Sequence, residues 1–454
     1  MTVRKFGGSS VNGSIQFKCL AKIIESFKED KSIIVVSAMG KTTNKLVSFN
    51  ENLSHNDLIF AEQDIKVIEE NHLNLITELD LGKEAKSILS KHLSLLRTIK
   101  DSVAINLDIT ESQKDAVLAV GELLSSNLLA LYFQKIGYKA VFLDSRYVVK
   151  SNSDFSNAEV DLPITFHNIK DSVQKLHTDN NIIIMGGFIA SDSKNRTTTI
   201  GRGGSDYTAA IAANAIDAKL LEIWTDVDGI MTIDPKFSSD ARRILHLSYD
   251  EAAELAYFGA RVLHPKTIGP AIKKNIPILV KNTFKPEIQG TLIANSENNP
   301  KMLKALSYWD NITVINVKSN RMLGAYGFLS KVFEIFKNYQ TSVDLIATSE
   351  VSISLTIDNP KNLPHLLNEL QEFSNVTVTS NQAIISAIGD GVKQTSGLAS
   401  RYFGILDKIN IQMVSIGASE VNISVVINSA DLETSLKLLH NEFFKNVNEP
   451  DVFE

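Results

Sequence analysis

The sequence has a single cysteine, Cys19, among its 454 residues. One thiol excludes an intramolecular disulfide and any zinc site that is built from several cysteines. A lone cysteine also fits a protein that works in a reducing compartment, and we expect a cytoplasmic location.

The chain also lacks an excess of basic residues and a long apolar run. Its 46 Lys and Arg residues are outnumbered by 52 Asp and Glu residues, and the formal net charge is −6. Surfaces dedicated to nucleic acid are usually basic, so this balance argues against a nucleic-acid partner. No apolar run approaches the roughly 18 residues of a membrane span, and a strand pattern directly after Met1 leaves no room for a signal peptide. We therefore expect a soluble protein with no membrane partner.

The composition that remains is that of an ordinary globular protein with a large core. Hydrophobic residues make up 44% of the chain and charged residues 22%. The length suggests roughly three domains of ~150 residues each.

Apolar segments typical of buried strands alternate with helical segments in the first part of the chain. A helical pattern covers residues 50–138, where Thr110 and Gln113 have the spacing of a capping box. This alternation predicts an α/β fold with a mainly parallel sheet flanked by helices. Several expected strands end in glycine or small polar residues, so we expect a site at one edge of the sheet. The expected strands are 3–6, 32–36, 139–143, 181–185, 220–224 and 276–280.

The stretch Gly201–Ala209 is the strongest candidate for an anion site. Its glycines allow close approach of the backbone, Arg202 adds a planar cation, and a helix is expected to begin near Ser205 and Asp206. The alternative is a flexible connector whose polar residues cap a helix. The stretch is not G-x-G-x-x-G, because Asp206 holds the last position. Gly40-Lys41-Thr42 is no P-loop either, because Val35 replaces the required glycine.

Two further charged residues have candidate roles. Lys5 is expected at the carboxyl end of the first strand, before Gly7 and Gly8, where the backbone could cradle phosphate; the alternative is a solvated lysine. Glu122 is the lone acid in an apolar helical run. It either reaches solvent at the helix edge or is placed to bind a cation or an amine.

The last third of the chain contains an internal repeat. Residues 327–335 recur as 397–405, and residues 349–354 recur as 419–424, both at an offset of 70. Each copy has the pattern of a ferredoxin-like α+β unit. The two units could sense a small ligand or only dimerise the chain, and these two interpretations are compatible.

Five ordered motifs together resemble those of the aspartokinases, within the amino-acid kinase superfamily, and the repeated units resemble paired ACT domains. The resemblance spans essentially the whole chain and is closest to the monofunctional type. It implies a catalytic domain at 1–294, ACT unit 1 at 302–380 and ACT unit 2 at 381–454, with strands that the two units can share. The motifs are Lys5–Val11, Gly201–Ala209, Trp224–Ile230 with Asp234 and Pro235, Phe258–Pro265, and Asn282–Phe284.

The resemblance implies that ATP, carried with Mg²⁺, phosphorylates the β-carboxylate of L-aspartate, and it implies no separate protein metal site. Carboxylate attack on phosphorus needs positioning and charge neutralisation more than a strong base. Ser9 stands where threonine is commoner, and Met231, Lys236 and Arg261 replace the common tyrosine, arginine and lysine. The implied catalytic residues are Lys5, Gly7, Gly8 and Asp206; the substrate-binding residues are Ser37, Thr43, Glu122, Arg202, Gly203 and Ser205; the nucleotide-binding residues are Lys5, Ser9, Thr225, Asp226, Met231, Lys236 and Arg261.

The first ACT unit resembles that of the lysine-inhibited aspartokinases. Asp344 and Glu350 could receive the ammonium groups of L-lysine, and the backbone before the helix at Phe328 could receive its carboxylate. The second copy has Val414 where the first has Asp344, so we expect it to pair with the first rather than bind lysine, in a homodimer or tetramer. The implied allosteric residues are Met322, Phe328, Leu329, Ser342, Val343, Asp344, Ser349 and Glu350.

Two other readings share part of this pattern. Acetylglutamate and uridylate kinases share the superfamily fold but do not normally carry tandem ACT units. A catalytically dead amino-acid sensor is a reading from a different class, and the presence of Lys5, Glu122, Arg202 and Asp206 argues against it.

Overall fold

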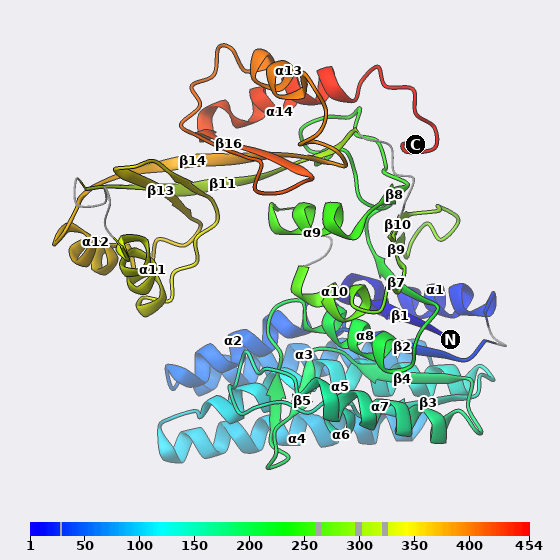
Figure 1. Ribbon diagram of the computed structural model, residues 1–454. Coiled ribbons are helices and arrows are strands. Elements are labelled where there is room, and N and C mark those ends of the chain that lie inside the picture. Colours follow the sequence, from blue (N-terminus) through cyan, green and yellow to red (C-terminus); the bar gives the residue numbers. More distant parts are fainter. Residues whose placement is uncertain (28–29, 260–264, 296–301, 320–325) are drawn as a thin grey trace. The chain divides into compact units, whose positions relative to one another are not determined.

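A computed structural model describes residues 1–27, 30–259, 265–295, 302–319 and 326–454 (Figure 1). The chain forms two compact units: unit 1 comprises Met1–Ile230 and Leu263–Asn295, and unit 2 comprises Met231–Val262 and Ser296–Glu454. This division differs from the expected boundary at residue 294, because residues after Ile230 bond to unit 2. The Leu306 N–H donates to the Thr232 carbonyl (2.7 Å), and Thr232 Oγ1 lies 3.0 Å from His440 Nε2.

The centre of unit 1 is the expected, mainly parallel sheet. Its strands from unit 1 follow the order β3-β4-β2-β1-β7-β9-β10, and only β10 runs antiparallel to its neighbour β9. Each apolar segment predicted as a strand forms one, within two residues of its expected ends. The bounds are β1 (Thr2–Phe6), β2 (Ser32–Val36), β3 (Ala140–Leu143), β4 (Ile182–Gly186), β7 (Leu220–Thr225), β9 (Ile278–Asn282) and β10 (Thr291–Ile293).

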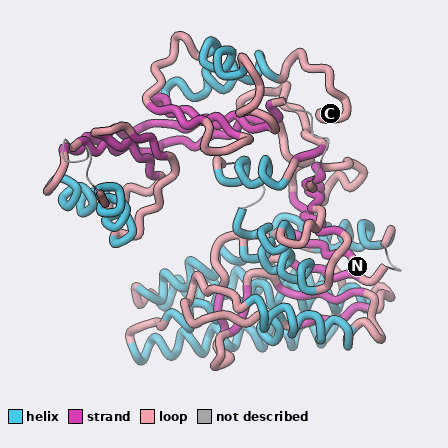
Figure 2. Tube along the Cα trace, in the orientation of Figure 1, coloured by secondary structure: helices cyan, strands magenta, loops and turns pink. Residues whose placement is uncertain are grey.

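Helices pack on this sheet, and Figure 2 shows them in cyan beside its magenta strands. Helix α5 packs on β2, β3 and β4, whereas α8 packs on β1, β2 and β7 together with α7 and α10. The hairpin of β5 (Ile189–Ser191) and β6 (Thr197–Thr199) follows β4. The helices are η1 (Gly8–Val11), α1 (Ser14–Glu25), α2 (Thr42–Ser54), α3 (Leu58–Glu78), α4 (Gly82–Asn106), α5 (Glu111–Lys135), α6 (Ser145–Val148), α7 (Leu162–Leu176), α8 (Gly204–Ala215) and α10 (Pro265–Ile272).

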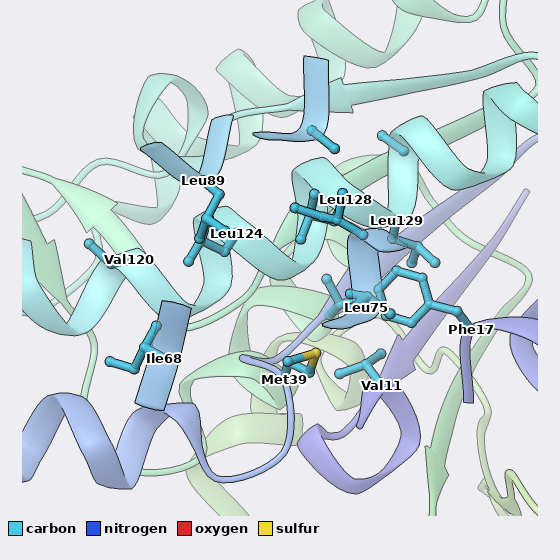
Figure 3. Packing of buried hydrophobic residues seen from close by; sticks show 14 of the residues in the cluster. Val11, Phe17, Met39, Ile68, Leu75, Leu89, Val120, Leu124, Leu128 and Leu129 are labelled. Carbon is cyan, nitrogen blue, oxygen red and sulfur yellow. The ribbon is translucent and has the colours of Figure 1, made fainter. Parts of the chain in front are cut away.

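The main core of unit 1 lies on the α5 side of the sheet. Ile34 and Val36 of β2 join this core, while Val35 faces the other way, as alternation along a strand requires. Figure 3 shows Leu124 and Leu128 of α5 within the same packing. By the same alternation, Phe6 belongs to the core and its neighbour Lys5 points to the α8 side.

Helix α5 begins with the predicted capping box. The Gln113 N–H donates to Thr110 Oγ1 (3.3 Å), and the Thr110 N–H donates to Gln113 Oε1 (2.9 Å). The helix is also long and apolar enough to cross a membrane by length and composition, which the sequence reading had not expected. However, 78% of its apolar window is buried inside the fold, as in a core helix.

Unit 2 contains a six-stranded antiparallel sheet in the order β12-β13-β11-β14-β16-β15. Long strands β11 and β14 form its centre. The elements are β8 (His246–Leu247), α9 (Tyr249–Tyr257), β11 (Leu303–Lys318), α11 (Phe328–Asn338), β12 (Ile346–Thr348), β13 (Ser352–Ile357), α12 (Leu363–Gln371), β14 (Asn375–Gly389), α13 (Leu398–Ile405), β15 (Met413–Ile416), β16 (Asn422–Asn428), η3 (Ser429–Asp431) and α14 (Leu432–Phe443).

The repeat seen in the sequence is also present in the structure. Gly327 and Gly397 both precede a helix in the left-handed conformation, with φ of 83° and 79°. Each copy has the ferredoxin-like strand order only if β11 and β14 are counted in both. The two units therefore share their central strand pair.

Candidate active site

A cavity of about 430 Å³ lies in unit 1 at the carboxyl ends of β1, β2 and β4. All six residues predicted to bind substrate line it, together with Lys5 and Asp206. The sequence reading did not single out Ser156 or Phe188, which also line it. The complete lining is Lys5, Ser37, Thr43, Glu122, Ser156, Phe188, Gly201, Arg202, Gly203, Gly204, Ser205 and Asp206.

The glycine-rich stretch forms the wall of this cavity at the start of α8. Gly203 has a φ of 74°, which favours glycine, and precedes the first helical residue, Gly204. Among the described residues no side chain caps the helix, so the capping alternative does not describe this stretch. Instead, the Ser37 hydroxyl donates to Ser205 Oγ (3.0 Å), and Asp206 faces Lys5. The polar side chains are thus directed to neighbouring strand ends.

Lys5 is not a solvated lysine. Its Nζ lies 2.7 Å from Asp206 Oδ1, and the two side chains are 11% and 14% exposed. A largely buried ion pair at a cavity wall places a cation where an incoming anion would contact it.

The glycines after β1 serve different purposes. The Gly7 N–H donates to the Trp224 carbonyl (3.2 Å) in this structure, and the expectation that it meets a phosphoryl group stays a prediction. The Gly8 carbonyl accepts from the Gly40 N–H (3.0 Å). A Cβ on Gly8 would lie 2.9 Å from the Ala38 carbonyl oxygen, so close approach requires glycine there.

Glu122 is buried in α5, with 3% of its surface exposed, so the solvent-reaching alternative is excluded. Its Oε1 accepts a hydrogen bond from the Ala38 N–H (3.2 Å). Its Oε2 has no hydrogen-bond partner within the described part of the chain. Burial raises the pKa of this carboxyl to about 8, although the Ala38 bond opposes the shift. Such a group is suited to a cationic ligand that would restore its charge.

The residues predicted to bind nucleotide divide between the two units. In unit 1, Ser9 is exposed and the Thr225 hydroxyl donates to Asp226 Oδ1 (3.2 Å). In unit 2, Met231 is half-buried and Lys236 Nζ bonds the Tyr308 hydroxyl. Arg261 lies outside the described residues.

The predicted effector residues that the structure describes belong to unit 2. Phe328 and Leu329 begin α11, Ser342, Ser349 and Glu350 are exposed, and Val343 is half-buried; Met322 lies outside the described residues.

Asp344 has the most unusual environment of this set. Its N–H donates to the Thr356 carbonyl (2.9 Å), and its Oδ2 has no hydrogen-bond partner in the ranges described. Burial and the nearby Asp358 raise the pKa of the Asp344 carboxyl to about 7. Its counterpart in the second copy, Val414, is 39% exposed, and Glu420 pairs there with Lys393 (2.7 Å).

Comparison with known proteins supports an assignment to a family. The model of the amino acid kinase family matches residues 1–282, and an ACT domain model matches residues 385–443. A protein of Arabidopsis thaliana named aspartokinase 3, chloroplastic, is 38% identical over 463 residues, which cover 98% of this chain and 81% of that protein. The lysine-sensitive aspartokinase 3 of Escherichia coli is 35% identical over 98% of this chain and 99% of its own.

Solved structures agree with these matches. The crystal structure of E. coli aspartokinase III with aspartate and ADP has a TM-score of 0.86 at 34% identity, covering 98% of this chain and all of that one. The structure of the same enzyme with lysine and aspartate has a TM-score of 0.79 at 34% identity, covering 98% of this chain and 99% of that one. The chain belongs to the amino acid kinase family, and within that family it is an aspartokinase.

Proposed function

We propose that the cavity of unit 1 binds L-aspartate and that the chain transfers the γ-phosphoryl group of ATP to its β-carboxylate, giving 4-phospho-L-aspartate. The observation that carries this proposal is the buried Oε2 of Glu122, which has no hydrogen-bond partner among the described residues, in a cavity that also holds Lys5 and Arg202. An amino acid with a second carboxylate offers an ammonium to Glu122 and an anion to each cation.

The side chains divide these tasks by their chemistry. Arg202 is exposed and carries the planar fork that suits the α-carboxylate. Ser37, Thr43 and Ser205 supply hydroxyls to the same ligand. Glu122 receives the ammonium, because a buried carboxylate is stabilised most by a charge that enters with the substrate.

Phosphoryl transfer then requires charge neutralisation rather than a base, because the attacking carboxylate is already ionised. Lys5 meets the developing charge on the transferring group, and Asp206 orients Lys5 across 2.7 Å. The Gly8 amide stands at the start of η1, which follows β1.

ATP brings Mg²⁺ to this reaction. The described residues include no group of three or more His, Cys, Asp or Glu that could hold a metal ion. The phosphate oxygens and water would therefore supply most Mg²⁺ ligands, with a carboxylate such as Asp206 contributing at most one. When bound, the ion neutralises phosphate charge. Ser9, Thr225, Asp226, Met231, Lys236 and Arg261 are the proposed nucleotide residues.

We further propose that L-lysine inhibits the enzyme by binding unit 2 near Asp344. Its raised pKa suits an ammonium group, and so does its Oδ2, which has no hydrogen-bond partner in the part of the chain that the structure describes. Glu350 would take the second ammonium. Lysine must bind one state more tightly than another to inhibit. We also propose that the chain assembles as a homodimer or tetramer through its ACT units and works in the cytoplasm, which the single cysteine favours.

A coupled assay of ADP release, with and without L-aspartate, tests the catalytic proposal. Turnover should depend on aspartate, and N-acetylglutamate and uridylate should not replace it. Aspartate-independent ATP hydrolysis, or preference for either alternative acceptor, would overturn the assignment. No turnover with any acceptor would favour the sensor reading.

A further inference from the structure

We propose that Asp115, which does not line the substrate cavity, is the positioning residue for the cavity wall made by Ser156 and by Gly201 and Arg202. The inference rests on the proposed function, because it assigns that wall to aspartate binding. It adds a residue to which neither the motifs nor the comparisons give a role.

Asp115 lies on the same helix as Glu122 and two turns before it, so both point from one face of α5. Its side chain is fully buried. Each of its carboxylate oxygens lies 3.0 Å from the Ser156 amide nitrogen. The Thr199 N–H donates to Oδ2 (2.7 Å), and the Thr199 hydroxyl donates to Oδ1 (3.0 Å). One carboxylate therefore joins two segments that are far apart in the sequence.

Both segments lead directly into the cavity. Ser156 is itself a lining residue. Thr199 ends β6, two residues before Gly201 and three before Arg202. The segments also meet each other, because the Ala158 N–H donates to the Thr199 carbonyl (2.9 Å). A displacement of either segment would move the guanidinium that is proposed to hold the substrate.

The backbone at these positions needs the hydrogen bonds to Asp115 to hold its conformation. Ser156 has a φ of 71°, a left-handed conformation that costs free energy for a residue with a Cβ. Gly201 has a φ of 76°, and a Cβ there would lie 2.5 Å from Asn157 Oδ1. The two turns are packed too closely to relax independently, and Asp115 accepts the N–H groups that fix them.

The carboxylate matters here because each hydrogen-bond partner of Asp115 in the described residues is a donor. Burial raises the pKa of Asp115, while its bonds to Ser156 and Thr199 oppose that shift and favour the ionised form. An asparagine has the same shape but turns an NH₂ donor toward an N–H donor, so at least one bond must be lost.

The matched control is Asp192→Asn. Asp192 is also almost fully buried, and it accepts the N–H groups of Lys194 and Arg196 (both 2.9 Å) at the far end of the β5–β6 hairpin. It does not line the cavity. Its Oδ2 also accepts from the Ser153 hydroxyl (3.0 Å), but the Ser156 and Thr199 N–H groups bond to Asp115. Loss of the Asp192 carboxylate should therefore lower stability without freeing those two N–H groups.

In the full-length enzyme, Asp115→Asn should raise KM for aspartate by about tenfold or more, the effect of losing a hydrogen bond to a charged group. KM for ATP should not change, and Asp192→Asn should leave both KM values unchanged. Equal changes in both KM values, or the same aspartate effect in Asp192→Asn, would overturn the positioning role. If Asp115→Asn does not fold, Thr199→Val provides the test, because valine fits a strand and removes only the hydroxyl donor. Thr199→Val should then raise KM for aspartate and leave KM for ATP unchanged.

Amide hydrogen exchange separates this inference from the proposed function. Exchange at Ser156 and Thr199 should accelerate in Asp115→Asn, and not in Asp192→Asn, whatever the substrate proves to be. Unchanged exchange refutes the positioning role even if the unaltered enzyme phosphorylates aspartate. Faster exchange at Ser156 and Thr199 in Asp115→Asn, together with no aspartate-dependent turnover in the unaltered enzyme, supports the positioning role and refutes the proposed function instead.

Discussion

The protonation of Glu122 should control how tightly the enzyme binds aspartate. The carboxyl is 3% exposed, its Oε2 lacks a hydrogen-bond partner in the described part of the chain, and burial raises its pKa from 4.5 to about 8. At about 1.4 kcal/mol for each pH unit, ionising it in the empty cavity costs roughly 5 kcal/mol relative to water. The ammonium of aspartate is the group that offsets this cost.

The direction in which KM for aspartate changes with pH follows from the raised pKa of Glu122. Below about pH 8 the empty site is mostly neutral, so aspartate must displace a proton in order to bind. KM for aspartate should therefore fall about tenfold between about pH 6 and about pH 7, and level off above about pH 8. Steady-state assays at saturating ATP measure this dependence. Glu122→Gln should raise KM for aspartate and remove the pH dependence, while KM for ATP serves as the internal control.

Two results would refute this reasoning. A KM for aspartate that stays flat between about pH 6 and about pH 8 would show that Glu122 is already ionised or does not meet the substrate. If KM for aspartate depends on pH equally in Glu122→Gln and in the unaltered enzyme, the group that releases the proton is not Glu122. Succinate, which lacks the ammonium, should be a very poor substrate, and comparable kcat/KM values for succinate and aspartate would remove the Glu122 role altogether.

Three further predictions concern other parts of the chain. Lys5→Ala should lower kcat at least ~100-fold with little change in KM for aspartate, because a contact to transition-state charge is lost; near-full turnover would remove Lys5 from the phosphoryl site. Asp344→Ala should keep activity without lysine and lose inhibition by lysine, so retained sensitivity, or inhibition by threonine instead, would contradict the effector proposal. His72 is fully buried and its pKa is lowered to about 4, so as the pH falls from about 6.5 to about 4 the unfolded chain binds a proton that the folded chain does not. Denaturant titrations should show a loss of roughly 3 kcal/mol over that range, which His72→Gln should reduce, and equal slopes would exclude His72.

Much of unit 1 could be predicted because its strands are short apolar runs with glycine or polar ends. Parallel strands bring those ends to one edge, so Lys5 and Ser37 could be expected together. Glu122 could be singled out because one acid in a long apolar helix is unusual.

The parts that the sequence did not reveal depend on backbone conformation and pairing. Ser156 and Phe188 line the cavity from left-handed turns with φ of 71° and 66°, which are uncommon for residues with a Cβ and have no sequence signature. The Gly7 N–H is used by Trp224, a contact that exists only once β7 lies beside β1. Pairing of this kind is set by the fold rather than by local residue types.

The shared strand pair of unit 2 makes its two repeats inseparable. Strands β11 and β14 pair from Leu303 with Gly389 to Lys318 with Asn375, and each repeat takes one of these strands from the other. A protease that cut the loop between β14 and α13 would break the chain without releasing either fragment, because β14 in the first fragment would still pair with β16 in the second, from Gln382 with Asn428 to Ile388 with Asn422. The gene duplication thus produced one cooperative folding unit, in which neither copy can be deleted or exchanged without leaving the other with an open sheet edge.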